Sequence, residues 1–252
     1  DDATDKRFQS IYQTEWDWRG KHVAGDEDTA TAGGHLPDVS KKAQGEKLAY
    51  WQGVLKQLDA IDVAQLSPKE ADNYRVYRFQ IETLIKGQVF RLYERPLSGD
   101  TSFWGDIAAG ARGSFTSEAD YRTYLTQLGD VPRYFKDNTD NMRAGLKRGF
   151  TLPRISLEGR DVSITGVIDS ATPEDSIFYQ PFKTMPAAIP AAKQAELRAQ
   201  AVAVIRDKVV PAHRDLLHFF RDEYLPGAVK STAAYDLPDG RAFYQAQVRE
   251  YT

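Results

Sequence analysis

The sequence predicts an all-α fold, a multi-helix array, and three observations support this. Apolar residues recur every three to four positions along most of the 252 residues. The alternation of apolar and polar residues that a strand needs is hardly visible. Capping signatures and helix-ending prolines or glycines mark the expected starts and ends of helices along the chain. Without a repeat or a low-complexity tract, we expect a single helical region over residues 1–252, with a candidate sub-division near 150–190.

The first two helices are predicted from apolar stripes. One covers residues 5–22, and the other follows Ser40, a residue type that favours the N-cap. A Gly- and Asp-rich loop separates them. The stripe residues are Phe8, Ile11, Tyr12 and Trp16 in the first helix and Leu48, Trp51, Leu55 and Leu58 in the second.

The third predicted helix has a sharp start and stop. The SPKE sequence over residues 67–70 is a capping box with proline at the first helical position. Its apolar pattern continues to about Tyr93, and Pro96 then ends it. The next segment, LSGDTSFWGDIAAGARGSF, is rich in glycine and is predicted to be a loop containing a helical turn.

Two helices are predicted between residues 117 and 149. Ser117-x-x-Asp120 is a second capping signature, and the helix that it begins is expected to break around Gly129. A further helix is expected over residues 131–148, with Gly149 as its C-cap.

The C-terminal third is also predicted to be helical. RISLEGRDVSITGVI is assigned to helix, although its β-branched residues and glycines lower helix propensity. Thr172-Pro173 begins a short helix that ends near Pro181. The longest pattern spans residues 191–224, and Pro211 must kink or divide it because proline lacks a backbone donor.

Composition excludes several classes of protein. The net charge of −3 argues against a nucleic-acid surface, which carries a basic excess. No apolar run approaches the ~20 residues that span a bilayer, so we expect no membrane span. Cysteine is absent, which excludes disulfides, thiolate zinc sites and a cysteine nucleophile.

The four histidines do not suggest a metal site in this chain. His213 and His218 are five positions apart, which on a helix leaves their rings about 140° from each other. Ligands on one helix face need a spacing of three or four. We therefore expect one histidine to be satisfied near the core and the other to be partly exposed. His22 and His35 flank a loop and have no nearby ligand partners in the sequence.

Two segments contain candidate substrate-binding residues. Phe103 and Trp104 lie in the predicted long loop, where they would line a cleft for a peptide-like ligand or, alternatively, anchor the loop to the helices beneath. Arg241 and Tyr244 follow a tight turn near the end of the chain. They would hold a carboxylate and donate to an oxyanion, or else form a salt bridge and a core contact. No catalytic residue is predicted.

Three sets of residues, in order along the chain, resemble the bacterial family known as domain of unknown function 885 (DUF 885). The likeness covers almost the whole sequence, and its specificity comes from the order and spacing of the sets. They are Asn141-Met142-Arg143-x-Gly145 with Gly149 and Pro153, then Glu223-Tyr224-Leu225-Pro226, then Leu237-Pro238-Asp239-Gly240 with Tyr244.

The resemblance implies an enzyme about twice as long as this chain. Members of the family resemble helical zincin-type metallopeptidases, similar to the carboxypeptidase Taq and oligopeptidase groups. Their His-Glu zinc motif lies beyond the counterpart of Thr252. We therefore expect zinc in a missing C-terminal half and no cofactor in this chain. Many relatives are exported, which implies a periplasmic or other extracytoplasmic location, with a lipid anchor before trimming.

The expected function is that of the N-terminal helical half of an exported zinc metallopeptidase or hydrolase, forming a wall of a peptide-binding cleft. Its partners would be the C-terminal half of the same protein and a peptide substrate. This hypothesis predicts a large exposed apolar patch where the second half docks. The alternatives are a non-catalytic helical binding or scaffold module with a covered core, and an inactive homologue that kept the cleft and lost the metal.

Overall fold

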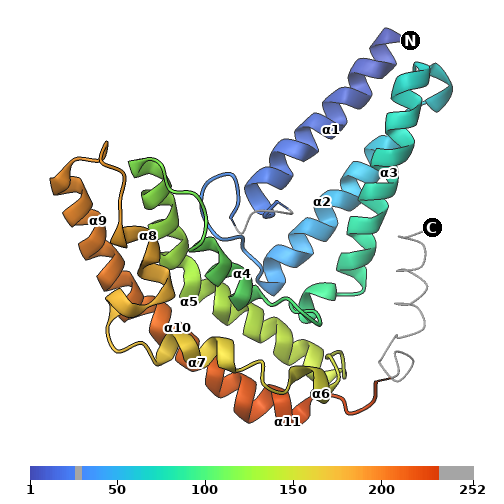
Figure 1. Cartoon of the computed structure of the whole chain (residues 1–252). Helices are drawn as coiled ribbons and strands as arrows, with labels where there is room; N and C mark the ends of the chain where they lie inside the picture. Colours follow the sequence, from blue (N-terminus) through green and yellow to red (C-terminus); the bar gives the residue numbers. More distant parts are fainter. Residues whose placement is uncertain (26–29, 233–252) are drawn as a thin grey trace.

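A computed structural model of the chain describes residues 1–25 and 30–232 (Figure 1). In these two ranges the regular structure is helical, and no strand is present; one isolated antiparallel bridge joins Leu97 and Ser102. The prediction of an all-α fold is therefore confirmed. Within the same ranges, no helix combines the length and the apolar character that crossing a membrane requires.

Three long helices near the N-terminus lie side by side and project from the rest of the molecule, as Figure 1 shows. They are α1 (Asp2–His22), α2 (Lys41–Asp59) and α3 (Pro68–Val89), and we call them the arm. Their starts follow the predicted caps. Ser40 Oγ accepts from the backbone N–H of Ala43, and Ser67 Oγ accepts from that of Glu70.

The remaining helices form the body. Figure 1 shows α5 running through it, with α9 and α10 alongside. The α-helices of the body are α4 (Phe103–Gly110), α5 (Glu118–Lys147), α6 (Arg154–Leu157), α7 (Val162–Ile168), α8 (Gln180–Lys183), α9 (Ala191–Val204), α10 (Val210–Phe219) and α11 (Leu225–Gly227). Short 3₁₀ turns connect the elements at η1 (Val63–Gln65), η2 (Leu92–Glu94), η3 (Pro173–Asp175) and η4 (Ile177–Tyr179).

The predicted break at Gly129 is wrong, because α5 continues through Gly129 and through Pro132. Leu128, Val131 and Phe135 are all buried in the body. Packing of this face outweighs the roughly 3 kcal/mol that an internal proline costs a helix. The start of α5 is as predicted, since Ser117 and Asp120 satisfy each other's backbone N–H groups.

The end of α5 also follows the prediction. Gly149 stands one position after the C-cap residue Arg148 and has a positive φ of 72°. The N–H of Phe150 donates to the carbonyl of Gly145 at 2.8 Å, and the N–H of Gly149 donates to that of Leu146 at 3.1 Å. This pair of bonds is a Schellman motif, and it turns the chain away from the helix axis.

The long C-terminal pattern is one helical run that changes its winding before each proline. A π turn at η5 (Ile205–Val209) precedes Pro211, and a second at η6 (Phe220–Tyr224) precedes Pro226. In a π turn the backbone N–H groups pair with carbonyls five residues away instead of four. The helical run therefore continues past each proline, which has no N–H to donate. The predicted interruption at Pro211 therefore takes the form of a π turn.

Buried apolar side chains form two clusters. The smaller one lies within the arm and the loop that joins α2 to α3. The larger one lies within the body and also includes Leu36, from the segment between α1 and α2. The chain passes from one cluster to the other between Ile81 and Leu97, whereas the candidate sub-division near 150–190 falls inside the larger cluster. The single region and its sub-division stay predictions.

Candidate functional site

Residues 35–39, between α1 and α2, attach the arm to the body. Every backbone carbonyl in this segment accepts a hydrogen bond. The donors come from the preceding loop, from α2 and from α5: Thr31 to His35, Arg133 to Leu36 and Pro37, Lys47 to Asp38, and Asn141 to Val39. Hydrogen bonds therefore hold the segment in place along its whole length, although it belongs to neither a helix nor a sheet.

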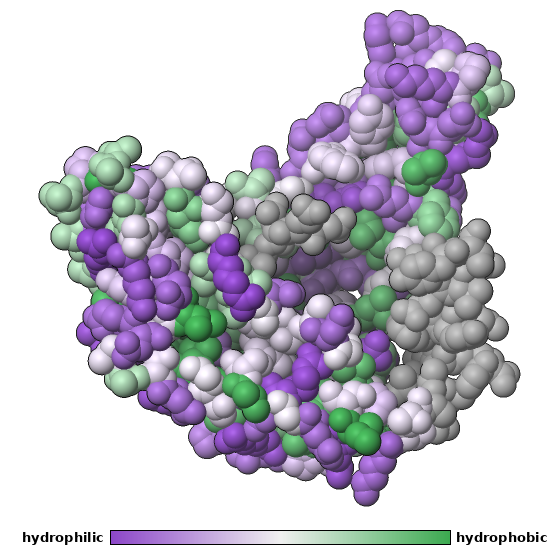
Figure 2. All heavy atoms as spheres, in the orientation of Figure 1, coloured by the Kyte–Doolittle hydropathy of each residue, from purple (hydrophilic) through white to green (hydrophobic). Residues whose placement is uncertain are grey.

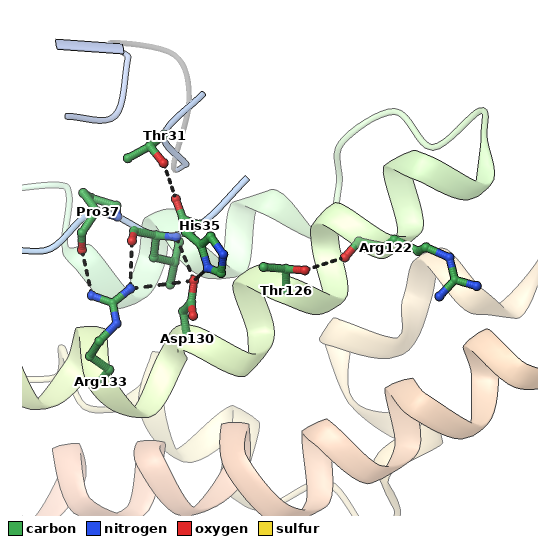
Figure 3. A network of polar contacts seen from close by, with 8 residues as sticks. Thr31, His35, Pro37, Arg122, Thr126, Asp130 and Arg133 are labelled. Atoms are coloured by element: carbon green, nitrogen blue, oxygen red, sulfur yellow. Dashed lines mark hydrogen bonds and ion pairs between the residues drawn. The ribbon is translucent and has the colours of Figure 1, made fainter. Parts of the chain in front are cut away.

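Asp130 of α5 fixes the start of this segment (Figure 3). Its Oδ2 accepts from the backbone N–H of Leu36 at 3.0 Å and lies 2.8 Å from Nδ1 of His35. The guanidinium of Arg133, one turn further along α5, lies 3.7 Å from the same oxygen. These contacts clamp the segment against α5, so the position of the arm depends on side chains of the body.

A groove of about 450 Å³ lies where the arm meets the 35–39 segment. We call it the junction groove, and its volume is in the range of small-ligand sites. Figure 2 shows that the surface is hollowed between the arm and the body. Apolar side chains dominate the wall, among them Val39, Trp51, Phe79, Leu84 and Phe90. The polar side chains that line it are those of Gln44, Lys47, Thr83, Lys86 and Gln88.

A second pocket, of about 500 Å³, shares Pro37 and Lys47 with the junction groove. One wall is an aromatic stack in which Trp18 lies between Tyr50, at 3.8 Å between ring centroids, and His22, at 4.5 Å. Its lining has acidic as well as basic side chains. The two pockets are thus neighbours on either side of a shared lysine.

Lys47 is a buried charged residue that lines both pockets. Only 7% of the residue is exposed, and its Nζ donates to the backbone carbonyl of Asp38 at 2.9 Å. Burial lowers the pKa of the Lys47 ammonium below its ordinary value, and the Asp38 carboxylate opposes that shift only in part. A buried cation beside an apolar groove favours an anionic group as a neighbour.

The expectation that Phe103 and Trp104 are exposed on a long loop is wrong. They are the first residues of α4, which Ser102 caps through the N–H of Gly105, and they are 3% and 2% exposed. The indole N–H of Trp104 donates to Ser163 Oγ at 2.9 Å. Both rings belong to the body's core, as in the alternative interpretation of this segment. Burial of apolar surface stabilises a glycine-containing helix that propensity alone disfavours.

The other two candidate residues, Arg241 and Tyr244, lie outside the described residues. Their role stays a prediction.

The interpretation of the paired histidines is confirmed. His213 is 1% exposed, and its Nδ1–H donates to the carbonyl of Val209 at 2.7 Å. Burial lowers the pKa of His213 to about 4. His218 is exposed and lies 3.3 Å from Asp222. Over residues 1–25 and 30–232, no group of three or more His, Cys, Asp or Glu side chains is placed to hold a metal ion.

Sequence reasoning missed Lys47, although a signal for it was present. The buried face of α2 includes Ala43, Lys47, Trp51, Val54 and Leu58, spaced by three or four residues. A lysine on this stripe is a charged residue at a core position. The prediction instead traced the stripe through Leu48 and Leu55, which are only partly buried.

Comparison with known proteins identifies the family of this chain. The family model described as "Bacterial protein of unknown function (DUF885)" matches residues 22–252. A solved structure described as "The crystal structure of the putative lipoprotein from Colwellia psychrerythraea" is similar, with a TM-score of 0.72 and 13% identity. The similarity covers 98% of this chain and 44% of that one, so this chain spans less than half the length of that protein. At this identity the likeness concerns the fold alone.

No curated protein matches the sequence. Since the family model covers most of the chain, the protein belongs to the bacterial family of unknown function DUF885.

Proposed function

We propose that this chain is the N-terminal helical part of an exported zinc metallopeptidase or related hydrolase, in which it forms a wall of the peptide-binding cleft. The observation that carries the proposal is the junction groove. An apolar wall with a few convergent polar groups is the usual character of a site for a small organic ligand or a peptide segment. Family membership and the greater length of the Colwellia psychrerythraea structure support a larger protein with a second part.

The surface of the arm supports the same proposal. Most of the large apolar side chains that are exposed among the described residues lie on the arm or in the short 3₁₀ turns at either end of α3. They are Trp16, Val63, Val76, Phe79, Val89 and Leu92. Two of them, Phe79 and Leu92, also line the junction groove. We propose that the remainder of the protein covers part of this surface and closes the groove into a cleft.

The described residues do not fit a zinc site. His213 is buried against a backbone carbonyl, and the other histidines contact no converging set of carboxylates. A catalytic zinc site needs about three protein ligands around one point. The proposal therefore assigns zinc and the catalytic groups to the remainder of the protein, and it assigns only substrate binding to this chain.

An extracytoplasmic location is part of the proposal. The solved structure that resembles this chain carries the description "putative lipoprotein", and a lipoprotein is held at a membrane surface by a lipid anchor. We propose an extracytoplasmic location for this protein as well, with a lipid anchor on the N-terminal side of residue 1.

The complete gene product, with the chain as its N-terminal part, provides the test. We expect it to bind about one zinc ion per chain and to hydrolyse peptides from a fluorogenic library, with activity lost on chelation and restored by zinc. If the metal-loaded protein binds peptides without cleaving them, a binding module or an inactive homologue is correct instead.

A groove variant tests the role of this chain separately. Gly87 lines the junction groove, and a Cβ atom added there would meet only Leu92, at 3.7 Å. Gly87→Leu should fill the groove and lower kcat/KM for peptides by roughly tenfold. Gly53→Leu is the matched control, since Gly53 is also helical, has open space around it and does not line the groove. If the two variants have equal activity, the junction groove does not bind the substrate.

A further inference from the structure

The ammonium group of Lys47 has more N–H donors than there are hydrogen-bond acceptors around it. It carries three N–H groups, and among the described residues it has one hydrogen bond, to the carbonyl of Asp38. A buried charge is costly unless it is paired, and a single neutral acceptor compensates only part of that cost. The group therefore has unused donor capacity, and it belongs to a residue that lines both the junction groove and the second pocket.

Among the described residues, the charged side chains that line the groove have one sign. They are Lys47 and Lys86, and no described aspartate or glutamate lines it. Lys86 forms no ion pair with any described residue. Asp38, whose carboxylate interacts electrostatically with Lys47, lines the second pocket and accepts from the backbone N–H of Ser40. A ligand anion in the groove would meet two lysines and none of the described carboxylates among the lining residues.

The remainder of the wall is mostly apolar. Trp51, Phe79 and Leu84 present ring and aliphatic surface, while the amide of Gln88 is occupied by Gln44 of α2 at 2.8 Å. This bond uses the amide nitrogen of Gln88 and the amide oxygen of Gln44. The groove thus combines an apolar surface with two lysines.

We propose that the junction groove binds a carboxylate attached to an apolar body, with the ligand carboxylate accepting from Nζ of Lys47. This assignment deepens the proposed function and rests on it for the identification of the groove as substrate surface. Two sources have this chemistry, the C-terminal end of an apolar peptide and a fatty acid.

The test is calorimetric titration of the complete protein with four probes. They are the peptide Leu-Leu-Phe, its C-terminal amide, octanoate and octanamide. We expect a carboxylate probe to bind about tenfold or more tightly than its amide, since a charge-assisted bond replaces a neutral one. Preference for Leu-Leu-Phe over octanoate identifies a peptide end, and the reverse identifies a fatty acid.

Lys47→Met is the decisive variant, because methionine keeps much of the side-chain volume and removes the charge. It should remove the preference for carboxylate over amide while leaving amide binding in place. Lys56→Met, on the same helix but outside both pockets, should leave the preference unchanged. Thermal unfolding of each variant identifies any loss of fold, and Lys47→Gln provides a second neutral variant should the methionine protein fail to fold.

Failure of this inference is distinct from failure of the proposed function. If no probe binds, or if acid and amide bind equally well to the unaltered protein, the carboxylate site is wrong even when the protein hydrolyses peptides. If binding depends on Lys47 but no hydrolysis occurs, the site is correct and the peptidase proposal is wrong.

Discussion

Nε of Arg143 donates to Oε2 of Glu223 at 2.8 Å, across 80 positions of sequence. The two residues belong to two of the motifs that suggested the family, and the bond joins α5 to the second π turn of the C-terminal run. Arg143 also contacts Asp140, and its guanidinium lies 4.7 Å from the centre of the Phe219 ring. A single arginine thus combines an ion pair with a stacked contact at the interface of two helices.

The ion pair itself should contribute little stability. Both side chains are about half exposed, at 44% and 50%, and exposed pairs contribute about 0–1 kcal/mol. In a double-mutant cycle of Arg143→Ala and Glu223→Ala, we expect a coupling energy below about 1 kcal/mol. Arg143→Ala alone should cost more than Glu223→Ala because it also removes the contact with Phe219. Urea denaturation measures all four proteins, and equal single-variant losses would contradict this ranking.

Gly145, in the same family motif, allows close backbone packing. A Cβ at this position would overlap the carbonyl oxygen of Glu94 and lie 3.1 Å from that of Phe150. Gly145→Ala should therefore force η2 away from α5 and destabilise the protein by about 3 kcal/mol. Gly129→Ala is the control on the same helix, where a Cβ meets nothing within 4 Å. It should stabilise by about 0.5–1 kcal/mol, so denaturation midpoints that shift in the same direction would refute the explanation.

Glu15 is a buried carboxylate satisfied by four donors. Oε1 accepts from Arg19 and from the hydroxyl of Tyr77, and Oε2 accepts from Arg19 and from the indole of Trp51. In Glu15→Gln the amide nitrogen must face one of these donors in either orientation. The expected loss is about 3 kcal/mol or more. Glu82→Gln, at a partly exposed pair with Arg78, should change stability by no more than about 0.5 kcal/mol in the same denaturation assay.

Local signals made the helix boundaries predictable. Ser40, Ser67, Ser117 and Gly149 act through atoms three or four residues away, so their roles can be read from short stretches of sequence. The continuity of α5 depends on tertiary packing, which overrode the local cost of Pro132.

The site was harder to predict than the boundaries. The first helix was expected to bury Trp16, yet Trp16 is 58% exposed and Glu15 is buried beside it. The donors that make this possible lie on α2 and α3, far along the chain. The junction groove likewise depends on how the 35–39 segment is held against α5, which a periodic pattern does not encode.

His213 should make stability depend on pH. Its pKa is lowered from 6.5 to about 4 because the ring is buried, so the native state favours the neutral form. Well above pH 6.5 the ring is neutral in both states and contributes no pH dependence. As pH falls from 6.5 towards 4, the unfolded chain takes up the proton and the native state does not, so the free energy of unfolding decreases. The contribution amounts to about 3 kcal/mol by pH 4 and does not grow below it.

Carboxylates titrate near the lower end of this window, so the comparison must be made between variants. His213→Asn keeps a donor for the carbonyl of Val209 but loses the ring contacts with Phe135 and Phe178. Its stability at pH 7 should fall by about 2 kcal/mol or more through the cavity that the smaller side chain leaves. Its loss of stability between pH 6.5 and 4 should be smaller than that of the unaltered protein by up to about 3 kcal/mol. His218→Asn, at a side chain that is 82% exposed, should run parallel to the unaltered protein. Urea denaturation at several pH values provides the curves, and a His213→Asn curve parallel to that of the unaltered protein would show that burial of the neutral ring has no linkage to folding.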